Sequence, residues 1–477
     1  MNIQNHTHPT SDMIEKFKTL IGDEHVITDS KDMSQYLTEW RDLYQGKASC
    51  ILLPGSTQDV SHILSYAHEM NIAIVPQGGN TGLVGGQIPF ESGHEVIINL
   101  SRMNSIRNID TAGNTMTVEA GAILQNIQDA ADNAERLFPL SLAAEGSCQI
   151  GGNLATNAGG VGVLAYGNAR NLVLGLEVVL ADGQIWNGLR ALTKDNTGYN
   201  LKDLFIGSEG TLGIITTAVL KLFPKPAEQS TAFLGAQSLQ DVAHLFSLAS
   251  QIAGHQLTAF ELLPRVGIEM VTKHIQEARD PLETPQPWYV LLEISSGQAT
   301  GNASELTEKI LETALENNYI HDGALALTIS QAKDFWRLRE AMSEVQREEG
   351  GSIKHDISVP IARIPEFIKR ANDAVETMIP GSRPVPFGHY GDGNIHYNVS
   401  QPTAMDKSAF LAQWDMMAEA VHSIVLDLEG SISAEHGIGR MKKDLLKDVK
   451  SPVELDLMQS IKKTFDPKGI LNPGKLI

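Results

Sequence analysis

Two glycine-rich segments constrain the fold of this chain more than any other feature of its sequence. Residues 76–86, Pro-Gln-Gly-Gly-Asn-Thr-Gly-Leu-Val-Gly-Gly, directly follow an apolar run, and residues 145–160 combine glycines with Ser, Thr and Asn. Glycine permits positive φ and a close approach to the backbone, so successive N–H groups can surround a phosphate oxygen. Two such segments favour a bound diphosphate, although tight turns and bulges would require the same glycines.

The first half of the chain alternates predicted strands and helices. Residues 49–53 form an apolar run, Ser56 is placed to cap a helix, and residues 72–75 form the next strand, which together predict a β-α-β unit. Asp182-Gly183 predicts a hairpin turn. Further strands are expected at 96–100, 116–118, 176–180 and 214–222.

Two common phosphate-binding motifs do not account for the glycines. Residues 160–165, Gly-Val-Gly-Val-Leu-Ala, match the G-x-G-x-x-A pattern but do not follow a convincing strand. The chain has no G-x-x-x-x-G-K-[ST] motif. We therefore expect a phosphate site of another kind.

A seam at residues 223–226, Phe-Pro-Lys-Pro, divides the chain, because two prolines interrupt the pattern. Beyond it, amphipathic helices are expected at 304–317 and 334–348 and a strand at 288–294. We expect domains at 1–228, with a core at about 45–224, and at 229–430, followed by a helical segment at 431–477 that packs back on the first domain.

Charge and composition exclude several classes of protein. Lys and Arg number 37 against 57 Asp and Glu, a net charge of −20, which disfavours binding to nucleic acid and to anionic lipid. No run of about 18 apolar residues could span a bilayer. The two cysteines, Cys50 and Cys148, are too few for a disulfide framework, and the start of the chain shows no targeting pattern. These features led us to expect a bacterial cytoplasmic location.

Residues 387–398 contain two histidines on either side of Asp392-Gly393, a dipeptide that predicts a two-residue hairpin turn. In that register His389 faces His396, and Asn398 lies on the same face. Directly opposed side chains have Cβ atoms about 5 Å apart, so two imidazoles could share a metal ion. Histidines without a ligand are the alternative. Residues 433–440 offer a third ligand in Glu435, with His436 beside it.

The helix expected at 334–348 carries a candidate anion-binding side chain. At about 100° per residue, Arg339 and Ser343 lie on the margin of its apolar stripe, whereas Arg337 points away. Arg339 can present a bidentate fork to a carboxylate and Ser343 a hydroxyl, or Arg339 can simply cover the core edge. Lys354 could likewise bind an anion or be an ordinary surface lysine. The stripe itself consists of Phe335, Leu338, Met342 and Val345.

Several segments together resemble flavoproteins of the vanillyl-alcohol oxidase type, and the resemblance extends over nearly the whole chain. They are PQGGNTGLVGG, GSCQIGGNLATNAGG, GSEGTLGIIT and the closing FDPKGILNPGK. The resemblance implies an α+β protein. Its parts would be an FAD-binding domain of two α/β subdomains, an α+β cap domain carrying a metal site, and a C-terminal helical segment.

The same resemblance assigns residues to the FAD. The first glycine-rich segment would hold the diphosphate, the second would line the flavin and ribityl chain, and Glu209, Gly210 and Ile215 would lie at the adenine end. Cys148 is interpreted as a buried structural cysteine, so the FAD is expected to be non-covalent. The expected FAD contacts are Pro76, Gly78, Gly79, Asn80, Thr81, Gly82, Gly85, Gly86, Leu140, Gly146, Ser147, Ile150, Gly151, Gly152, Asn153, Thr156, Asn157, Gly160, Tyr166, Gly167, Glu209, Gly210, Ile215 and Asn472.

The histidine hairpin and the SAEHGIG segment resemble the metal-dependent D-2-hydroxy-acid dehydrogenase branch of this family. By that resemblance His389, His396 and Glu435 bind zinc or a similar divalent ion, and His436 is the catalytic base. An imidazole suits that role because its unperturbed pKa lies near neutrality.

Two further segments, WRLREAMS and GSIKHDISVP, match the D-2-hydroxyglutarate dehydrogenases of that branch. The match implies that Arg339, Ser343 and Lys354 meet the distal carboxylate of a dicarboxylate substrate, with Asn398 as a further substrate contact. Ser343 stands where threonine is often found, which keeps the hydroxyl and loses a methyl contact.

We therefore expect FAD- and metal-dependent oxidation of a D-2-hydroxy acid by hydride transfer from C2 to flavin N5, with D-2-hydroxyglutarate favoured over D-lactate or another such acid. An electron-transfer flavoprotein or a quinone is the expected electron acceptor, and a homodimer the expected assembly. The alternatives are a metal-dependent hydrolase, which would be colourless, and a flavoprotein that only relays electrons.

Overall fold

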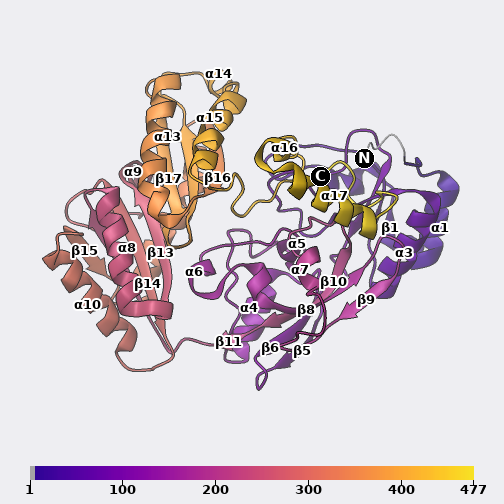
Figure 1. The fold of residues 1–477 in the computed structure, drawn as a ribbon, viewed down its shortest axis with the longest axis horizontal. Coiled ribbons are helices and arrows are strands. Elements are labelled where there is room, and N and C mark those ends of the chain that lie inside the picture. Colours follow the sequence, from indigo (N-terminus) through magenta and orange to yellow (C-terminus); the bar gives the residue numbers. More distant parts are fainter. Residues whose placement is uncertain (1–5) are drawn as a thin grey trace. The chain divides into compact units, whose positions relative to one another are not determined.

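The computed structural model describes residues 6–477, and the chain forms two compact units (Figure 1). The first unit comprises the chain up to residue 159 together with 167–224 and 435–477, and the second comprises 160–166 and 225–434. The sequence-based domain limits were 228 and 430. Residues 1–5, part of the segment in which we expected no targeting pattern, lie outside the described residues.

The first unit contains a four-stranded sheet in the order β1-β2-β4-β3, in which β2, β4 and β3 are parallel. Helix α3 (Thr57–Met70) connects β2 to β3, and its N-cap Ser56 accepts a hydrogen bond from the N–H of Asp59 at 3.1 Å. The predicted β-α-β unit is therefore confirmed. The other elements here are α1 (Ser11–Ile21), α2 (Ser30–Leu37), β1 (Val26–Ile27), β2 (Ala48–Leu52), β3 (Ala73–Gln77) and β4 (Glu95–Asn99).

A second, antiparallel sheet of the first unit has the order β5-β6-β10-β8-β9. The predicted turn at Asp182-Gly183 joins β8 to β9, and Gly183 has the positive φ of 89° that such a turn requires. The elements are β5 (Ile106–Asp110), β6 (Thr115–Glu119), α4 (Leu124–Asn133), β7 (Arg136–Leu137), α5 (Ile150–Ala155), β8 (Val173–Val179), β9 (Ile185–Gly188), α7 (Lys202–Phe205), β10 (Ile214–Lys221) and β11 (Phe223–Pro224).

Residues 435–477 belong to the first unit and contain α16 (Leu446–Val449) and α17 (Pro452–Phe465). After α17 the chain runs beside β3, where the N–H of Ile74 donates to Ile470 O at 2.8 Å. Lys475 and Glu95, both fully buried, form an ion pair at 3.2 Å. The end of the chain is thus anchored to the parallel sheet that precedes the first glycine-rich segment.

The second unit is built on a seven-stranded antiparallel sheet in the order β15-β12-β14-β13-β17-β18-β16. Apolar side chains from β12, β13, β14 and β17 form one core with helices α9 (Arg265–His274), α11 (Ile329–Glu340) and α12 (Met342–Val345). The strands are β12 (Glu228–Ala236), β13 (Leu257–Pro264), β14 (Trp288–Ser296), β15 (Asp322–Leu325), β16 (Ser352–Ser358), β17 (Arg383–His389) and β18 (Asn394–Ser400).

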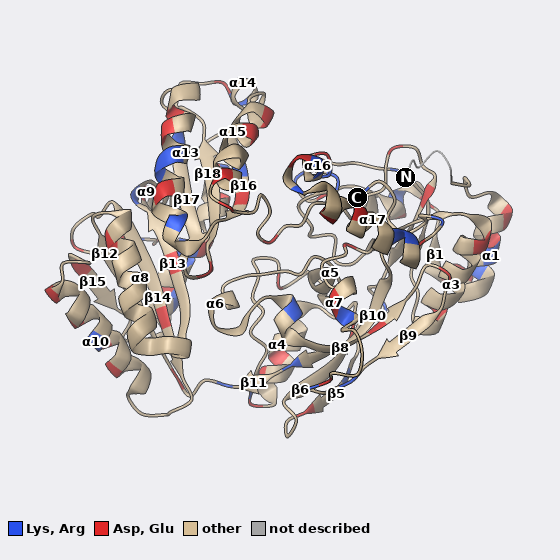
Figure 2. Ribbon diagram, in the orientation of Figure 1, with Lys and Arg blue, Asp and Glu red and all other residues tan. Residues whose placement is uncertain are grey.

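Acidic residues recur along the helices of this unit, for example on α10 and α15, which are coloured red at these positions in Figure 2. Its helices are α6 (Val163–Tyr166), α8 (Leu239–Ala253), α9 (Arg265–His274), α10 (Asn302–Glu316), α11 (Ile329–Glu340), α12 (Met342–Val345), α13 (Ile364–Met378), α14 (Lys407–Leu411) and α15 (Trp414–Asp427).

The single helix expected at 334–348 differs from the structure, which has α11 and the short α12 separated at Ala341. The backbone of Ala341 remains right-handed helical, with φ of −67° and ψ of −17°, so the apolar stripe continues across the break. The four predicted stripe residues are buried, at Phe335, Leu338, Met342 and Val345.

Candidate functional site

The two glycine-rich segments meet within the first unit. A Cβ placed on Gly79 would overlap the carbonyl oxygen of Ser147, and one on Gly78 would contact Gln149 at 3.4 Å. By contrast, a Cβ on Gly146 or Gly152 would meet no heavy atom within 4 Å. The segments therefore pack tightly against each other at one place and leave open space at another, which suits a ligand lying along both.

Unsatisfied polar atoms support this interpretation. Among the described residues, the side-chain oxygens of Asn80, Gln149, Asn153 and Asn472 are buried and have no hydrogen-bond partner. Buried polar groups are nearly always hydrogen-bonded, so these four atoms indicate a polar ligand that completes them. The ribityl and ribose hydroxyls of FAD offer such donors, and the residues present thus fit the cofactor.

The third glycine-containing segment, residues 207–213, joins the same region. A Cβ on Gly210 would lie 2.5 Å from Pro76 Cγ, at the start of the first glycine-rich segment. Glu209 adopts φ of 51°, and its carboxylate accepts the N–H groups of Ile438 at 2.7 Å and Gly439 at 2.8 Å. Burial is the main cause that raises the pKa of Glu209. The structure therefore uses this carboxylate, expected at the adenine end of the FAD, to bind the loop after His436.

The other predicted FAD residues lie in both units. Leu140, Ile150 and Ile215 are buried in the first, and Asn472 donates through its side chain to Gly86 O at 3.1 Å. Gly160 and Tyr166 belong to the second unit. Their contact with FAD remains a prediction.

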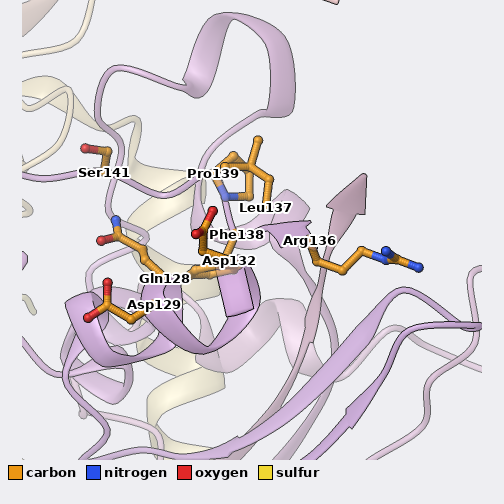
Figure 3. Close-up of a pocket in the computed structure, with 8 residues that line it drawn as sticks. All are labelled: Gln128, Asp129, Asp132, Arg136, Leu137, Phe138, Pro139 and Ser141. Carbon is orange, nitrogen blue, oxygen red and sulfur yellow. The ribbon is translucent and has the colours of Figure 1, made fainter. Parts of the chain in front are cut away.

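A separate pocket of about 240 Å³ lies beside α4 (Figure 3). Figure 3 shows Arg136 pointing away from the other lining residues, and its guanidinium donates to Asn114 Oδ1 and Thr111 O, both at 2.7 Å. None of the predicted site residues lines it. The lining residues are Gln128, Asp129, Asp132, Arg136, Leu137, Phe138, Pro139 and Ser141.

The histidine hairpin forms, but the predicted register is wrong. A 3₁₀ turn at Tyr390–Asp392 and Gly393, with φ of 91°, connects β17 to β18, so the connection is longer than two residues. Phe387 therefore pairs with His396, where His389 was expected. His389 lies two residues beyond Phe387, and the imidazole rings of His389 and His396 have centroids 5.5 Å apart. The two imidazoles are close together despite the different pairing.

Glu435 is the residue at which the chain leaves the second unit, since it is bonded to Ala434, the last residue of that unit. Ligand atoms of His389, His396 and Glu435 lie within 4.8 Å of one another, and a second such group contains Glu435, His436 and Asp356. A Cβ on Gly159 would lie 2.6 Å from Glu435 Oε1. Two imidazoles and a carboxylate are a donor set that suits zinc and several other divalent metals.

Sequence reasoning missed Glu261, which the structure places opposite His389 in neighbouring strands. Glu261 is 1% exposed; Oε1 lies 2.8 Å from His389 Nδ1, and Oε2 accepts from Arg339 Nε at 2.6 Å. Burial alone would raise the pKa of Glu261, but His389 and Arg339 hold it at about 2. An acidic residue within the apolar run 257–264 was the signal that could have drawn attention to it.

Arg339 is directed inward as predicted, at 8% exposed, and Arg337 is exposed. The guanidinium carbon of Arg339 also lies 5.0 Å from the centre of the Phe387 ring. The structure shows an arginine that is buried and ion-paired with Glu261, a partner that neither of the two alternatives included. Its contact with a substrate remains a prediction.

The remaining predicted substrate contacts lie around the same sheet. Lys354 Nζ donates to both the hydroxyl and the carbonyl oxygen of Ser343 at 2.9 Å, so the structure brings these two together. Asn398, the register partner of Lys354, donates to Gln346 Oε1 at 3.1 Å.

The comparisons with known proteins agree with this arrangement. A model described as FAD binding domain matches residues 48–188, and one described as FAD linked oxidases, C-terminal domain, matches residues 225–476. The chain therefore belongs to the FAD-linked oxidase family and is an oxidoreductase. The resemblance found in the sequence is confirmed.

Two curated relatives and one solved structure are similar to this chain in sequence or in fold. A mitochondrial D-2-hydroxyglutarate dehydrogenase of Arabidopsis thaliana is 39% identical, covering 97% of this chain and 81% of the relative. A mitochondrial Schizosaccharomyces pombe protein, provisionally named a D-lactate dehydrogenase, is 37% identical, covering 97% and 90%. The structure of p-cresol methylhydroxylase, 18% identical, has a TM-score of 0.77 and covers 99% of this chain and 98% of its own. The expected fold class is thereby confirmed, and the metal site of the cap domain stays a prediction.

The expected bacterial cytoplasmic location is wrong, because the relatives named D-2-hydroxyglutarate dehydrogenases are named as mitochondrial proteins. The small number of cysteines is consistent with a reducing compartment, but it does not indicate which reducing compartment the protein occupies. Among residues 6–477, no helix has both the length and the apolar character needed to cross a membrane.

Proposed function

We propose that this protein oxidises a D-2-hydroxy acid, with D-2-hydroxyglutarate and its product 2-oxoglutarate as the preferred pair. The observation that carries the proposal is the group formed by His389, His396 and Glu435 in a chain whose family binds FAD. The relatives named D-2-hydroxyglutarate dehydrogenases, 38–40% identical over nearly the whole chain, support the choice of substrate.

FAD, held by the glycine-rich segments, supplies the hydride acceptor, and a divalent cation at the three ligands, for which we propose zinc, supplies a Lewis acid. His436, next to Glu435 in the chain, takes the proton of the substrate hydroxyl. Removal of a hydride from C2 and a proton from the hydroxyl oxygen leaves the 2-oxo acid. A cation held by His389, His396 and Glu435 would bind the reacting end of the substrate beside His436, so these three residues would also help to orient C2.

Arg339, Ser343 and Lys354 bind the distal carboxylate, and Asn398 completes the substrate contacts. Two observations support the roles of the Arg339 and Lys354 side chains. Lys354 donates a hydrogen bond to Ser343, and Arg339 is directed inward. A guanidinium and an ammonium at this end suit a second carboxylate, which D-lactate lacks. The family has a relative provisionally named a D-lactate dehydrogenase, so D-lactate is the second candidate substrate.

The electron acceptor proposed is an electron-transfer flavoprotein or a quinone, since the sequence has no convincing nicotinamide-binding motif.

The test is an anaerobic titration. D-2-hydroxyglutarate, its L-enantiomer and D-lactate are added separately to the purified protein while the flavin absorbance is followed, with and without a chelator. We expect bleaching by D-2-hydroxyglutarate, abolished by the chelator. Equal or stronger bleaching by D-lactate would remove the distal-carboxylate roles, and a colourless protein would favour the hydrolase alternative.

A further inference from the structure

Glu261 links two predicted functional side chains that come from different elements. It lies on β13, directly opposite His389 of β17, while Arg339 reaches it from α11. One carboxylate oxygen faces His389 Nδ1 at 2.8 Å and the other faces Arg339 Nε at 2.6 Å. All three side chains are buried, Glu261 most completely at 1% exposed. The three side chains are thus carried by two neighbouring strands of one sheet and by a helix.

The contact with Glu261 determines which nitrogen of His389 is available to a metal. An ionised carboxylate only accepts hydrogen bonds, so His389 Nδ1 must carry the proton. In the neutral imidazole the lone pair then lies on Nε2. Carboxylates that bind the far side of a ligating histidine in this way fix its tautomer and ring orientation and increase its basicity.

The contact also determines how Arg339 can meet an anion. A guanidinium has five N–H donors, and the Nε donor is taken by Glu261. The two terminal nitrogens remain as the possible fork for a carboxylate. The negative charge of Glu261 partly balances the buried guanidinium, which would otherwise be costly to hold in the core.

We infer that Glu261 is a positioning residue that orients His389 for metal binding and Arg339 for the distal carboxylate. The inference rests on the proposed function and deepens it. It names Glu261 as the carboxylate that positions both the metal ligand His389 and the specificity residue Arg339. Loss of the Glu261 charge should then weaken metal binding and dicarboxylate recognition together.

The experiment compares Zn²⁺ affinity in the full-length flavoprotein. Wild type, Glu261→Gln and Glu349→Gln are stripped of metal and titrated with Zn²⁺ in competition with a chromophoric chelator. Glu349 is a matched control in the same unit. Its carboxylate also contacts a histidine and an arginine, His274 at 2.6 Å and Arg383 at 2.5 Å. Neither of these partners is among the predicted metal ligands.

We expect Glu261→Gln to weaken Zn²⁺ binding by about 10- to 100-fold, and Glu349→Gln to leave it unchanged. The glutamine amide can donate to Nδ1 and so stabilise the tautomer that protonates Nε2. In steady-state assays Glu261→Gln should raise the KM for D-2-hydroxyglutarate more than that for D-lactate. Flavin content and the melting temperature report whether each variant is folded.

The outcomes separate the inference from the proposed function. Unchanged Zn²⁺ affinity in Glu261→Gln, or an equal loss in Glu349→Gln, would overturn the inference while leaving the proposed function intact. A wild type that binds no Zn²⁺, or a His396→Ala variant that binds it as well as wild type, would overturn the proposed metal site itself. If Glu261→Gln does not fold, Glu261→Asp replaces it, because aspartate keeps the charge but is too short to reach both partners. Its Zn²⁺ affinity should then be weaker than that of wild type, and an unchanged affinity would overturn the inference.

Discussion

The carboxylate of Glu209 accepts the backbone N–H of Ile438 at 2.7 Å, two residues after the predicted catalytic base His436. Its second oxygen accepts the N–H of Gly439 at 2.8 Å. Hydrogen bonds to a charged group contribute about 1.5–3 kcal/mol each, more than most neutral ones. The loop that carries His436 is therefore bound to the first unit through its backbone, independently of the His436 side chain.

His436→Ala should consequently leave the loop and the FAD in place and remove only the imidazole. We expect the rate of flavin reduction by D-2-hydroxyglutarate to fall by about 10²- to 10⁴-fold, the range found when a general base is lost. Anaerobic stopped-flow absorbance measures this rate, and the flavin spectrum before mixing is the control. A variant reduced at the wild-type rate would end the assignment of His436 as the base.

The sequence was most informative where a residue type is required by backbone geometry or by helical spacing. The glycine-rich segments meet as expected, because Gly79 lies against the Ser147 carbonyl where no side chain fits. Arg339 faces inward because, at about 100° per residue, it lies on the margin of the apolar stripe of its helix.

The sequence was least informative where contacts between distant strands decide the outcome. Asp392-Gly393 is a strong two-residue turn signal, yet a 3₁₀ turn at Tyr390–Asp392 shifts the register so that Phe387 faces His396. Glu261 was missed for the same reason. Its function depends on its being opposite His389, 128 residues further along the chain, and no local pattern encodes such a pairing.

Arg339→Lys tests the distal-carboxylate pocket. Lysine keeps the charge near Glu261 but loses the planar fork, so it should weaken recognition of a dicarboxylate selectively. We expect the KM for D-2-hydroxyglutarate to rise at least about tenfold, equivalent to roughly 1.4 kcal/mol, with a much smaller change for D-lactate. Arg337→Lys, at an exposed position on the same helix, is the control and should change neither value. Equal effects of Arg339→Lys on both substrates would refute the pocket.

Gly79→Ala and Gly146→Ala distinguish structural from ligand-facing glycines. At Gly79 the added Cβ overlaps Ser147 O, whereas at Gly146 it meets nothing within 4 Å. We expect Gly79→Ala to lower the free energy of unfolding by about 1–3 kcal/mol, a typical cost of overpacking, and to lose FAD. Gly146→Ala should keep the stability of the FAD-free protein and weaken FAD binding alone. Chemical denaturation and flavin content measure the two effects, and a fully stable Gly79→Ala variant would contradict the packing described.

Glu349 provides a prediction about acid stability. Hydrogen bonds from Lys273, Arg383 and His274 lower its pKa from 4.5 to about 2. A carboxyl group whose pKa is lower in the folded protein stabilises the fold fully above its unfolded pKa, and this stabilisation is lost as the pH falls towards the folded value. With these two pKa values, the contribution at pH 4 should be about three-quarters of that at pH 7.

The measurement is the difference in free energy of unfolding between wild type and Glu349→Gln, from urea denaturation at both pH values. That difference should be largest at pH 7 and smaller by about a quarter at pH 4, because the carboxyl group of the unfolded chain, with its pKa of 4.5, is already mostly protonated there. Lys369→Met is a useful comparison, since its exposed ion pair with Asp373 should contribute little at either pH. A difference between wild type and Glu349→Gln that stays constant from pH 7 to pH 4 would show that packing around residue 349, and not its charge, stabilises this part of the second unit.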